Sequence, residues 1–250
     1  MAKTANPNKY LDKFQDQVAS AADRYRRLEH SLEASAESDE TKKGVAEDSA
    51  FRLGVLWETF QGDWFLASIS RDPAAFVGRM QGELNAAVDS SWARGVIEMM
   101  NPGALTLSPR PTLRQIEKML DPQGFNITFV DSKAWKKSAE KHLQGDYVTA
   151  VRRVADNVEA ASFLHLVKKL RNHLAHSSTG SKEEFNKAAK ARAANGRVGL
   201  TGAANDPLKR EDRGVSDLGK YLRVKPRQNG PRRVEIIHER LSEVSELMRV

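Results

Sequence analysis

The sequence contains no cysteine. Disulfides, thiolate metal ligands and a cysteine nucleophile are therefore excluded, and the cytoplasm is the expected compartment. No apolar run approaches the roughly 20 residues that a membrane-spanning helix needs, and the polar N-terminal segment predicts no signal peptide. Glycine-rich phosphate loops, the serine-hydrolase elbow and the His-Glu-x-x-His zinc motif are also missing. We therefore expect no cofactor, no resident metal and no association with a membrane.

What the sequence does contain suits a soluble globular protein: 250 residues, 40% hydrophobic and 29% charged. The formal net charge is +7, and it is unevenly distributed. Residues 131–250 hold 25 of the 40 Lys and Arg but only 15 of the 33 Asp and Glu, so all the excess positive charge lies there. Such a one-sided field attracts phosphate backbones. A merely solubilising surface is the alternative.

Apolar residues recur at three- and four-residue steps over most of the chain, which predicts an all-α helical bundle. The second helix has an apolar face wide enough for the centre of a bundle. Thr112 is expected to cap a short helix, and Ser181 with Glu184 resembles a capping box. Residues 125–130 favour either a lone strand or an extended connection. The expected helices, six to eight in all, lie within 10–32, 45–70, 73–100, 112–121, 132–143, 149–175 (starting at 146 or 149), 182–194 and 232–249, with 215–223 as a further candidate.

These elements predict a core with additions rather than two domains. A helix within 1–44 would pack on a helical core at 45–195, which carries an insertion at about 101–145. A basic mobile loop would follow at 196–231, and a C-terminal helix at 232–250. Trp57, Trp64 and Trp92 fall within apolar helical faces, so we expect them in the core rather than stacked on bases.

The most informative sequence is the hexapeptide Arg171-Asn172-His173-Leu174-Ala175-His176 at the end of a long helix. His173 and His176 are three residues apart and could share a metal ion, but no carboxylate lies at a suitable spacing. An Arg followed after four to six residues by His also occurs at Arg24 and His30 and at Arg232 or Arg233 and His238. Only the 171–176 match has Asn directly after Arg and ends a long helix.

This hexapeptide resembles the signature of the HEPN superfamily, in which Arg, commonly followed by Asn, precedes His by four to six residues at the end of a bundle helix. The resemblance covers mainly residues 45–195. It implies a helical bundle, a homodimer, and metal-independent RNA cleavage at the dimer interface. It also implies a toxin or effector in anti-phage or toxin–antitoxin defence, with an antitoxin or sensor protein as a partner. The family pattern includes an acidic residue on a preceding helix, for which Glu58 is a candidate, with Glu47 and Asp63 as alternatives.

The residue types suit this chemistry. Metal-free cleavage needs a base for the ribose 2′-OH, an acid for the leaving 5′-oxygen and a cation for the charged phosphorane. Histidine can transfer protons near neutral pH, and arginine presents paired donors to phosphate oxygens. We therefore expect Arg171 to hold the phosphate and His176 to act as acid or base. Asn172 and His173 would position them, and Glu58 is a further candidate for the site. The expected RNA-binding cations are Lys168, Lys169, Arg223, Lys225, Arg227, Arg232 and Arg233.

Helix geometry adds a condition. On a regular α-helix, residues five apart differ by about 140° in direction, so Arg171 and His176 flank opposite sides of the apolar stripe. A shared site then requires a curled Arg171 side chain, a helix that loosens near Ala175, or a second subunit. A structural role explains the same residues without catalysis, with His176 favoured at a helix C-terminus and Arg171 in an ion pair. The basic residues of 223–233 could likewise be a solvated linker. A non-catalytic binding or scaffold subunit is the alternative function, and a DNA-binding regulator is a weaker one.

Overall fold

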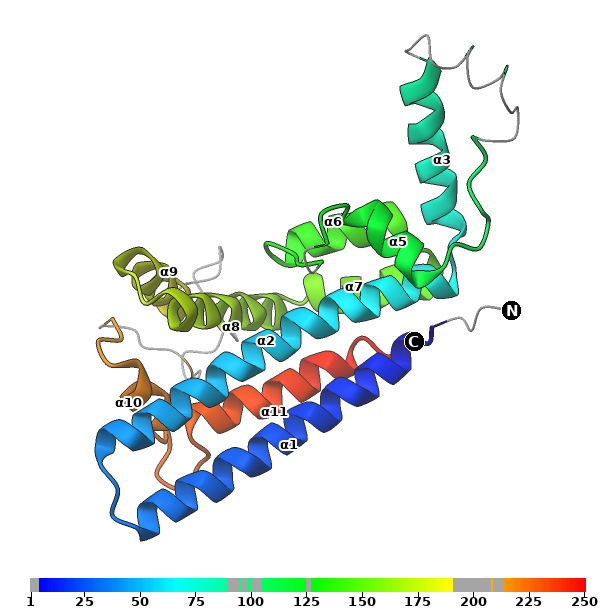
Figure 1. The fold of residues 1–250 in the computed structure, drawn as a ribbon. Helices are drawn as coiled ribbons and strands as arrows, with labels where there is room; N and C mark the ends of the chain where they lie inside the picture. Colours follow the sequence, from blue (N-terminus) through cyan, green and yellow to red (C-terminus); the bar gives the residue numbers. More distant parts are fainter. Residues whose placement is uncertain are drawn as a thin grey trace.

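The computed structural model of the chain describes residues 5–89, 105–124, 127–190 and 214–250, together with residues 95, 99 and 208. These residues form ten α-helices and contain no β-strand (Figure 1), which confirms the predicted all-α bundle. Residues 127–130 form an irregular connection. The sequence predicted either a lone strand or an extended connection at 125–130. The described residues 127–130 form the connection.

Two long helices form the base of the molecule. Helix α1 spans Pro7–Ala34 and α2 spans Asp39–Arg71, and they run side by side as an antiparallel hairpin (Figure 1). Ser38 begins α2, because its hydroxyl accepts a hydrogen bond from the Thr41 amide at 3.2 Å. Helix α2 also packs against α5, α8, α10 and α11. The central position that its wide apolar face predicts is therefore confirmed.

The C-terminal helix closes the base. Helix α11 spans Arg233–Glu246 and lies along α1 and α2 (Figure 1). Helix α10, Leu218–Arg223, packs on the N-terminal end of α2, with Asp217 as its N-cap. The described part of segment 196–231 thus contains a packed helix. Residues 191–207 and 209–213 lie outside the described residues.

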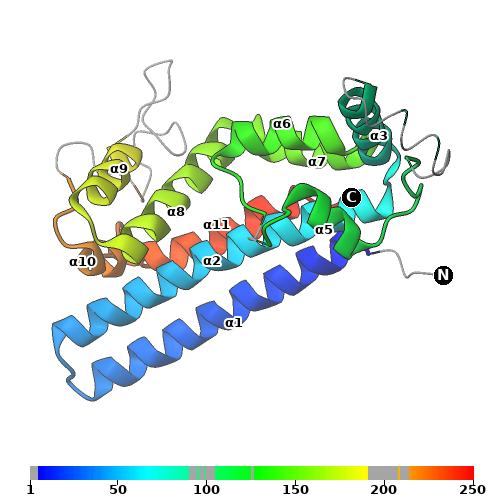
Figure 2. The same ribbon diagram turned by 45° about the horizontal axis from the view of Figure 1, so that its top comes forward.

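A second group of helices lies above this base (Figure 2). It consists of α3 (Ala74–Asp89), α5 (Leu113–Leu120), α6 (Ser132–His142), α7 (Gly145–Ala155), α8 (Val158–His176) and α9 (Thr179–Lys190). The expected cap of α5 is confirmed, because Thr112 and Gln115 form a reciprocal capping box. Trp57 and Trp64 lie in the core as predicted, whereas Trp92 is outside the described residues.

The single helix expected from residue 146 or 149 to Ala175 is wrong, because the chain breaks into α7 and α8 at Asp156 and Asn157. Asn157 is the N-cap of α8, and its side-chain oxygen accepts from the amides of Glu159 and Ala160 at 3.0 and 3.1 Å. The apolar spacing continues across this break. The apolar periodicity alone therefore did not predict the break between α7 and α8. An Asn followed by an acidic first turn is, however, a normal helix start.

The predicted capping box of the next helix is also wrong. Helix α9 begins at Thr179, so Ser181 lies inside its first turn. Ser178 takes the capping position instead, since its hydroxyl accepts from the Ser181 amide at 3.2 Å. The Ser181 hydroxyl bonds to the Ser178 backbone and also contacts His173 on α8. No helix among the described residues is long and apolar enough to cross a membrane.

Candidate functional site

Arg171 lies where α8 crosses α2 at close range. Its side chain passes directly over Gly54 of α2, and a Cβ atom placed on Gly54 would lie only 2.5 Å from the Arg171 Cβ. One turn further along α2, Glu58 contacts the Arg171 guanidinium at 3.3 Å. The ring of Phe51 lies on the other side, with its centroid 6.0 Å from Cζ of Arg171. Because residues 51, 54 and 58 are three and four apart, they share one face of α2.

The pair of Arg171 and Glu58 is partly shielded from solvent. The Arg171 side chain is 29% exposed and the Glu58 side chain 16%. Nη1 of Arg171 donates to the Asn172 side-chain oxygen at 3.2 Å, and its buried Nε has no hydrogen-bond partner. The guanidinium is thus held at two points while one donor is left unpaired, which costs free energy in a buried position. A guanidinium fixed in this way suits recognition of an oxyanion.

Of the three candidate acidic residues on α2, Glu58 is the one that contacts Arg171. Glu47 lies near the N-terminal end of α2, where it accepts a hydrogen bond from the Gly219 backbone and burial raises the pKa of its carboxyl. Burial also raises the pKa of Asp63, whose charged neighbours are Lys13 and Glu117. Neither of these two carboxylates contacts Arg171 in the part of the chain that the structure describes.

His173 is held in place by α9. Its Nδ1 lies 3.2 Å from the Ser181 hydroxyl, and its ring stacks on Phe185 with 6.3 Å between the centroids. Partial burial lowers the pKa of His173, and nearby Lys182 lowers it further. His173 therefore anchors α9 to α8, which is a positioning role and not direct contact with the Arg171 guanidinium.

His176 is the last residue of α8 and is exposed. Its side chain makes no hydrogen bond, ion pair or ring contact with another described residue. The helix ends at Ser177, which adopts a left-handed backbone with φ +48°, and its amide donates to the His173 carbonyl. Because α8 remains helical through His176, a loosened helix near Ala175, one of the three routes to a shared site, does not occur. Within one chain the structure records no contact between Arg171 and His176.

The two lysines that precede the hexapeptide are already engaged. Nζ of Lys168 donates to the Phe129 carbonyl, and burial lowers the pKa of its ammonium group. Lys169 pairs with Glu184 of α9 at 3.1 Å. Both remain close to Arg171 along α8, but neither presents a wholly free cation.

The remaining predicted RNA-binding residues divide into two groups. Arg223 and Arg232 both pair with the buried Glu29 of α1, and Arg233 is buried with its guanidinium over the Tyr221 ring. These three hold the C-terminal segment on the bundle. Lys225 and Arg227 are exposed, and their side chains have no partner among the described residues.

A polar cleft of about 560 Å³ lies beside the end of α8. His173 and Ser177 line it from α8 and its cap, Glu47 from α2, and Asp217 from the start of α10. Lys43 closes one side through its ion pair with Asp217 at 2.8 Å. Among the described residues, no group of three or more His, Asp or Glu side chains is placed to hold a metal ion.

The other Arg-to-His spacings lead to different environments. His238 is 2% exposed inside the bundle, whereas His30 is exposed on α1.

Compared with known protein families, curated proteins and solved structures, the chain matches none. Gly54 and Phe51 are the site residues that the sequence analysis missed. Their signal was the spacing of Phe51, Gly54 and Glu58 on one face, which gains meaning only once α8 is known to cross there.

Proposed function

We propose that the chain is a metal-independent endoribonuclease of the HEPN type, acting as a homodimer. The observation that carries this proposal is the arrangement of Arg171, held by Glu58 and Asn172, on the same helix that ends in the exposed, unpartnered His176. Arg171 supplies a fixed cation for a phosphate, and His176 supplies a group that transfers protons near neutral pH.

In this proposal Arg171 binds the scissile phosphate and stabilises the negative charge of the phosphorane. His176 removes the proton of the ribose 2′-OH, whose oxygen attacks phosphorus. A second histidine protonates the 5′-oxygen as the P–O bond breaks. Glu58 and Asn172 keep the guanidinium in place, and His173 fixes the end of α8 through Ser181. No step requires a metal ion.

The second subunit answers the geometric condition set by the helix. The Arg171 side chain faces α2, whereas His176 lies at the end of α8 and does not contact Arg171. In this proposal, one chain alone therefore does not complete the site. Two copies that meet across the ends of α8 would place His176 of one near Arg171 of the other, and would supply both histidines. The proposed setting is a toxin or effector in host defence, restrained by an antitoxin or sensor protein.

The test is cleavage of total RNA in the presence of EDTA. We expect the wild type to cleave RNA and His176→Ala to lose at least about 100-fold in rate, the usual contribution of a general acid or base. His30→Ala is the matched control, because His30 is also exposed and follows an Arg at a similar spacing. It should retain full activity. Cleavage that persists in His176→Ala, or that EDTA abolishes, contradicts the proposal.

Glu58→Gln separates positioning from folding. The amide keeps the shape of the side chain but removes the charge that holds Arg171, so we expect slower cleavage with an unchanged unfolding temperature to within a few degrees. Glu117→Gln is a control on α5, outside the site. Equal loss of activity in both variants would contradict a specific role for Glu58.

One observation favours a second candidate, a non-catalytic binding or scaffold subunit. The Arg171 guanidinium already has an intrachain partner in Glu58, and Arg223, Arg232 and Lys169 are ion-paired as well. If wild-type protein leaves RNA intact both with and without metal ions, this second function replaces the first.

A further inference from the structure

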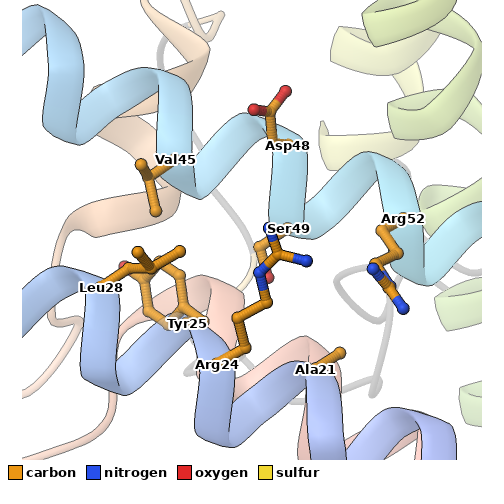
Figure 3. Close-up of a pocket in the computed structure, with 8 residues that line it drawn as sticks. All are labelled: Ala21, Arg24, Tyr25, Leu28, Val45, Asp48, Ser49 and Arg52. Atoms are coloured by element: carbon orange, nitrogen blue, oxygen red, sulfur yellow. The ribbon is translucent and has the colours of Figure 1, made fainter.

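A cavity of about 170 Å³ lies in the groove between α1 and α2 (Figure 3). Ala21, Tyr25 and Leu28 line it from α1, and Val45 lines it from α2, so most of its wall is apolar. Leu28 is 40% exposed, which is unusual for a large apolar side chain in this protein. The groove therefore offers open, apolar contact area to a ligand of matching size.

Two arginines flank this apolar wall. Arg24 reaches up from α1 and Arg52 reaches down from α2, so both guanidinium groups lie over the groove, while the carboxylate of Asp48 points away from it (Figure 3). Neither Arg24 nor Arg52 makes an ion pair or hydrogen bond with another described residue. The groove is therefore positively charged, and its donors are available to an anion.

Ser49 adds a hydrogen-bond acceptor. Nδ1 of the buried His238 lies 2.8 Å from the Val234 carbonyl oxygen and must donate to it, because a carbonyl can only accept. Burial lowers the pKa of His238 to about 4, so the ring is neutral and its Nε2 is an acceptor. The Ser49 hydroxyl, 3.4 Å from Nε2, consequently donates to His238 and presents only its lone pairs to the cavity.

The cavity thus combines three properties: two free guanidinium groups at the rim, an apolar wall, and a hydrogen-bond acceptor, the Ser49 hydroxyl oxygen. A ligand that matches all three carries an anionic group, a compact apolar body and an N–H donor. We propose that this groove binds a nucleotide, with its phosphate on Arg24 and Arg52 and its base against Tyr25, Leu28 and Val45, donating an N–H to Ser49.

This site is separate from the one that contains Arg171. On α2, residues 45, 49 and 52 lie on roughly the opposite side of the helix from residues 51, 54 and 58. The proposal therefore does not rest on ribonuclease activity. A nucleotide could reach the groove as a free mononucleotide or as an unpaired residue of an RNA strand, and both present the same chemistry.

The test measures binding of adenosine 5′-monophosphate by calorimetry. We expect wild type to bind it more tightly than ribose 5-phosphate, which lacks the base. Arg24→Ala and Arg52→Ala should each weaken binding about 10-fold or more, as expected for loss of a charged hydrogen bond. Arg27→Ala is the matched control, because Arg27 is an exposed arginine of α1 that does not line the cavity. It should bind as wild type does.

Leu28→Glu provides a second variant, since it places a carboxylate at the exposed apolar edge and should abolish binding without disturbing the core. Equal affinity for ribose 5-phosphate would overturn the proposal, as would unchanged affinity in both Arg24→Ala and Arg52→Ala. So would the absence of binding at millimolar concentrations.

The source of the nucleotide is decided in the His176→Ala background, where the proposed cleavage is removed. If the occupant is an RNA residue, a ten-nucleotide unstructured RNA will displace adenosine 5′-monophosphate. Arg24→Ala will then also weaken the binding of this RNA. If the occupant is a free nucleotide, the RNA will not compete. Both outcomes support the site, and neither depends on whether the wild type cleaves RNA.

Discussion

Replacing Gly54 by alanine tests whether α8 is held against α2 by the absence of a side chain. An alanine Cβ would lie 2.5 Å from Cβ and 2.8 Å from Cγ of Arg171, whereas carbon atoms pack best about 3.5–4.0 Å apart. The helices must therefore separate locally by about 1 Å. Overpacking of this kind typically costs about 1–3 kcal/mol, while alanine gains about 1 kcal/mol over glycine inside a helix.

Gly44→Ala provides the control, because Gly44 lies on the same helix and a Cβ there would meet nothing within 4 Å. It should raise the free energy of unfolding by up to about 1 kcal/mol. The difference between the two variants removes the helix propensity and leaves the packing cost of about 1–3 kcal/mol. Urea denaturation followed by circular dichroism measures both. If Gly54→Ala is as stable as Gly44→Ala, the close approach at Arg171 is wrong.

Three further predictions concern stability. Burial lowers the pKa of His142 and His238 to about 4, below the unfolded value of about 6.5. The unfolded chain therefore binds more protons, so stability is complete above pH 6.5 and falls by roughly 3 kcal/mol per histidine as pH drops to 4. Denaturation midpoints that stay constant between pH 6.5 and pH 4 would contradict this predicted loss of stability. Ser177→Gly should stabilise by about 1 kcal/mol, because Ser177 has φ +48°; a lower melting temperature would argue against this. Asn157→Ala should cost about 1 kcal/mol through loss of the α8 cap, and amide exchange at residues 159 and 160 should quicken.

Much of the fold could be predicted from apolar spacing, because long amphipathic helices carry that signal at every turn. The helices now seen as α1 and α11 were expected within three residues of their observed ends, whereas α2 begins six residues before the expected position 45. The signal failed at Asp156 and Asn157, where the apolar pattern continues through a break and a single cap decides the structure. It failed again at Ser181, since two serines three residues apart could both begin α9, and only the observed turn selects Ser178.

The candidate site was only partly predictable for a different reason. The hexapeptide identified Arg171, Asn172 and His176, but which acidic residue meets Arg171 depends on where α8 crosses α2. Glu47, Glu58 and Asp63 all lie on α2, and sequence spacing does not distinguish them. The crossing point is fixed by Gly54, whose role appears only in three dimensions. The basic residues from 223 onward show the same limit, because Arg223 and Arg232 both pair with Glu29, which lies near the other end of the chain.

That contact between distant segments has a consequence for how the protein folds. Glu29 meets Arg223, which is 194 residues away along the chain, and α11 completes the hydrophobic faces of α1 and α2. Closing so long a loop is entropically costly, and contacts between distant residues form slowly. Helices α1 and α2 are synthesised long before α11, so their apolar faces stay open to other chains in the meantime. The apolar faces of α1 and α2 therefore depend on protection against aggregation until α11 has been synthesised.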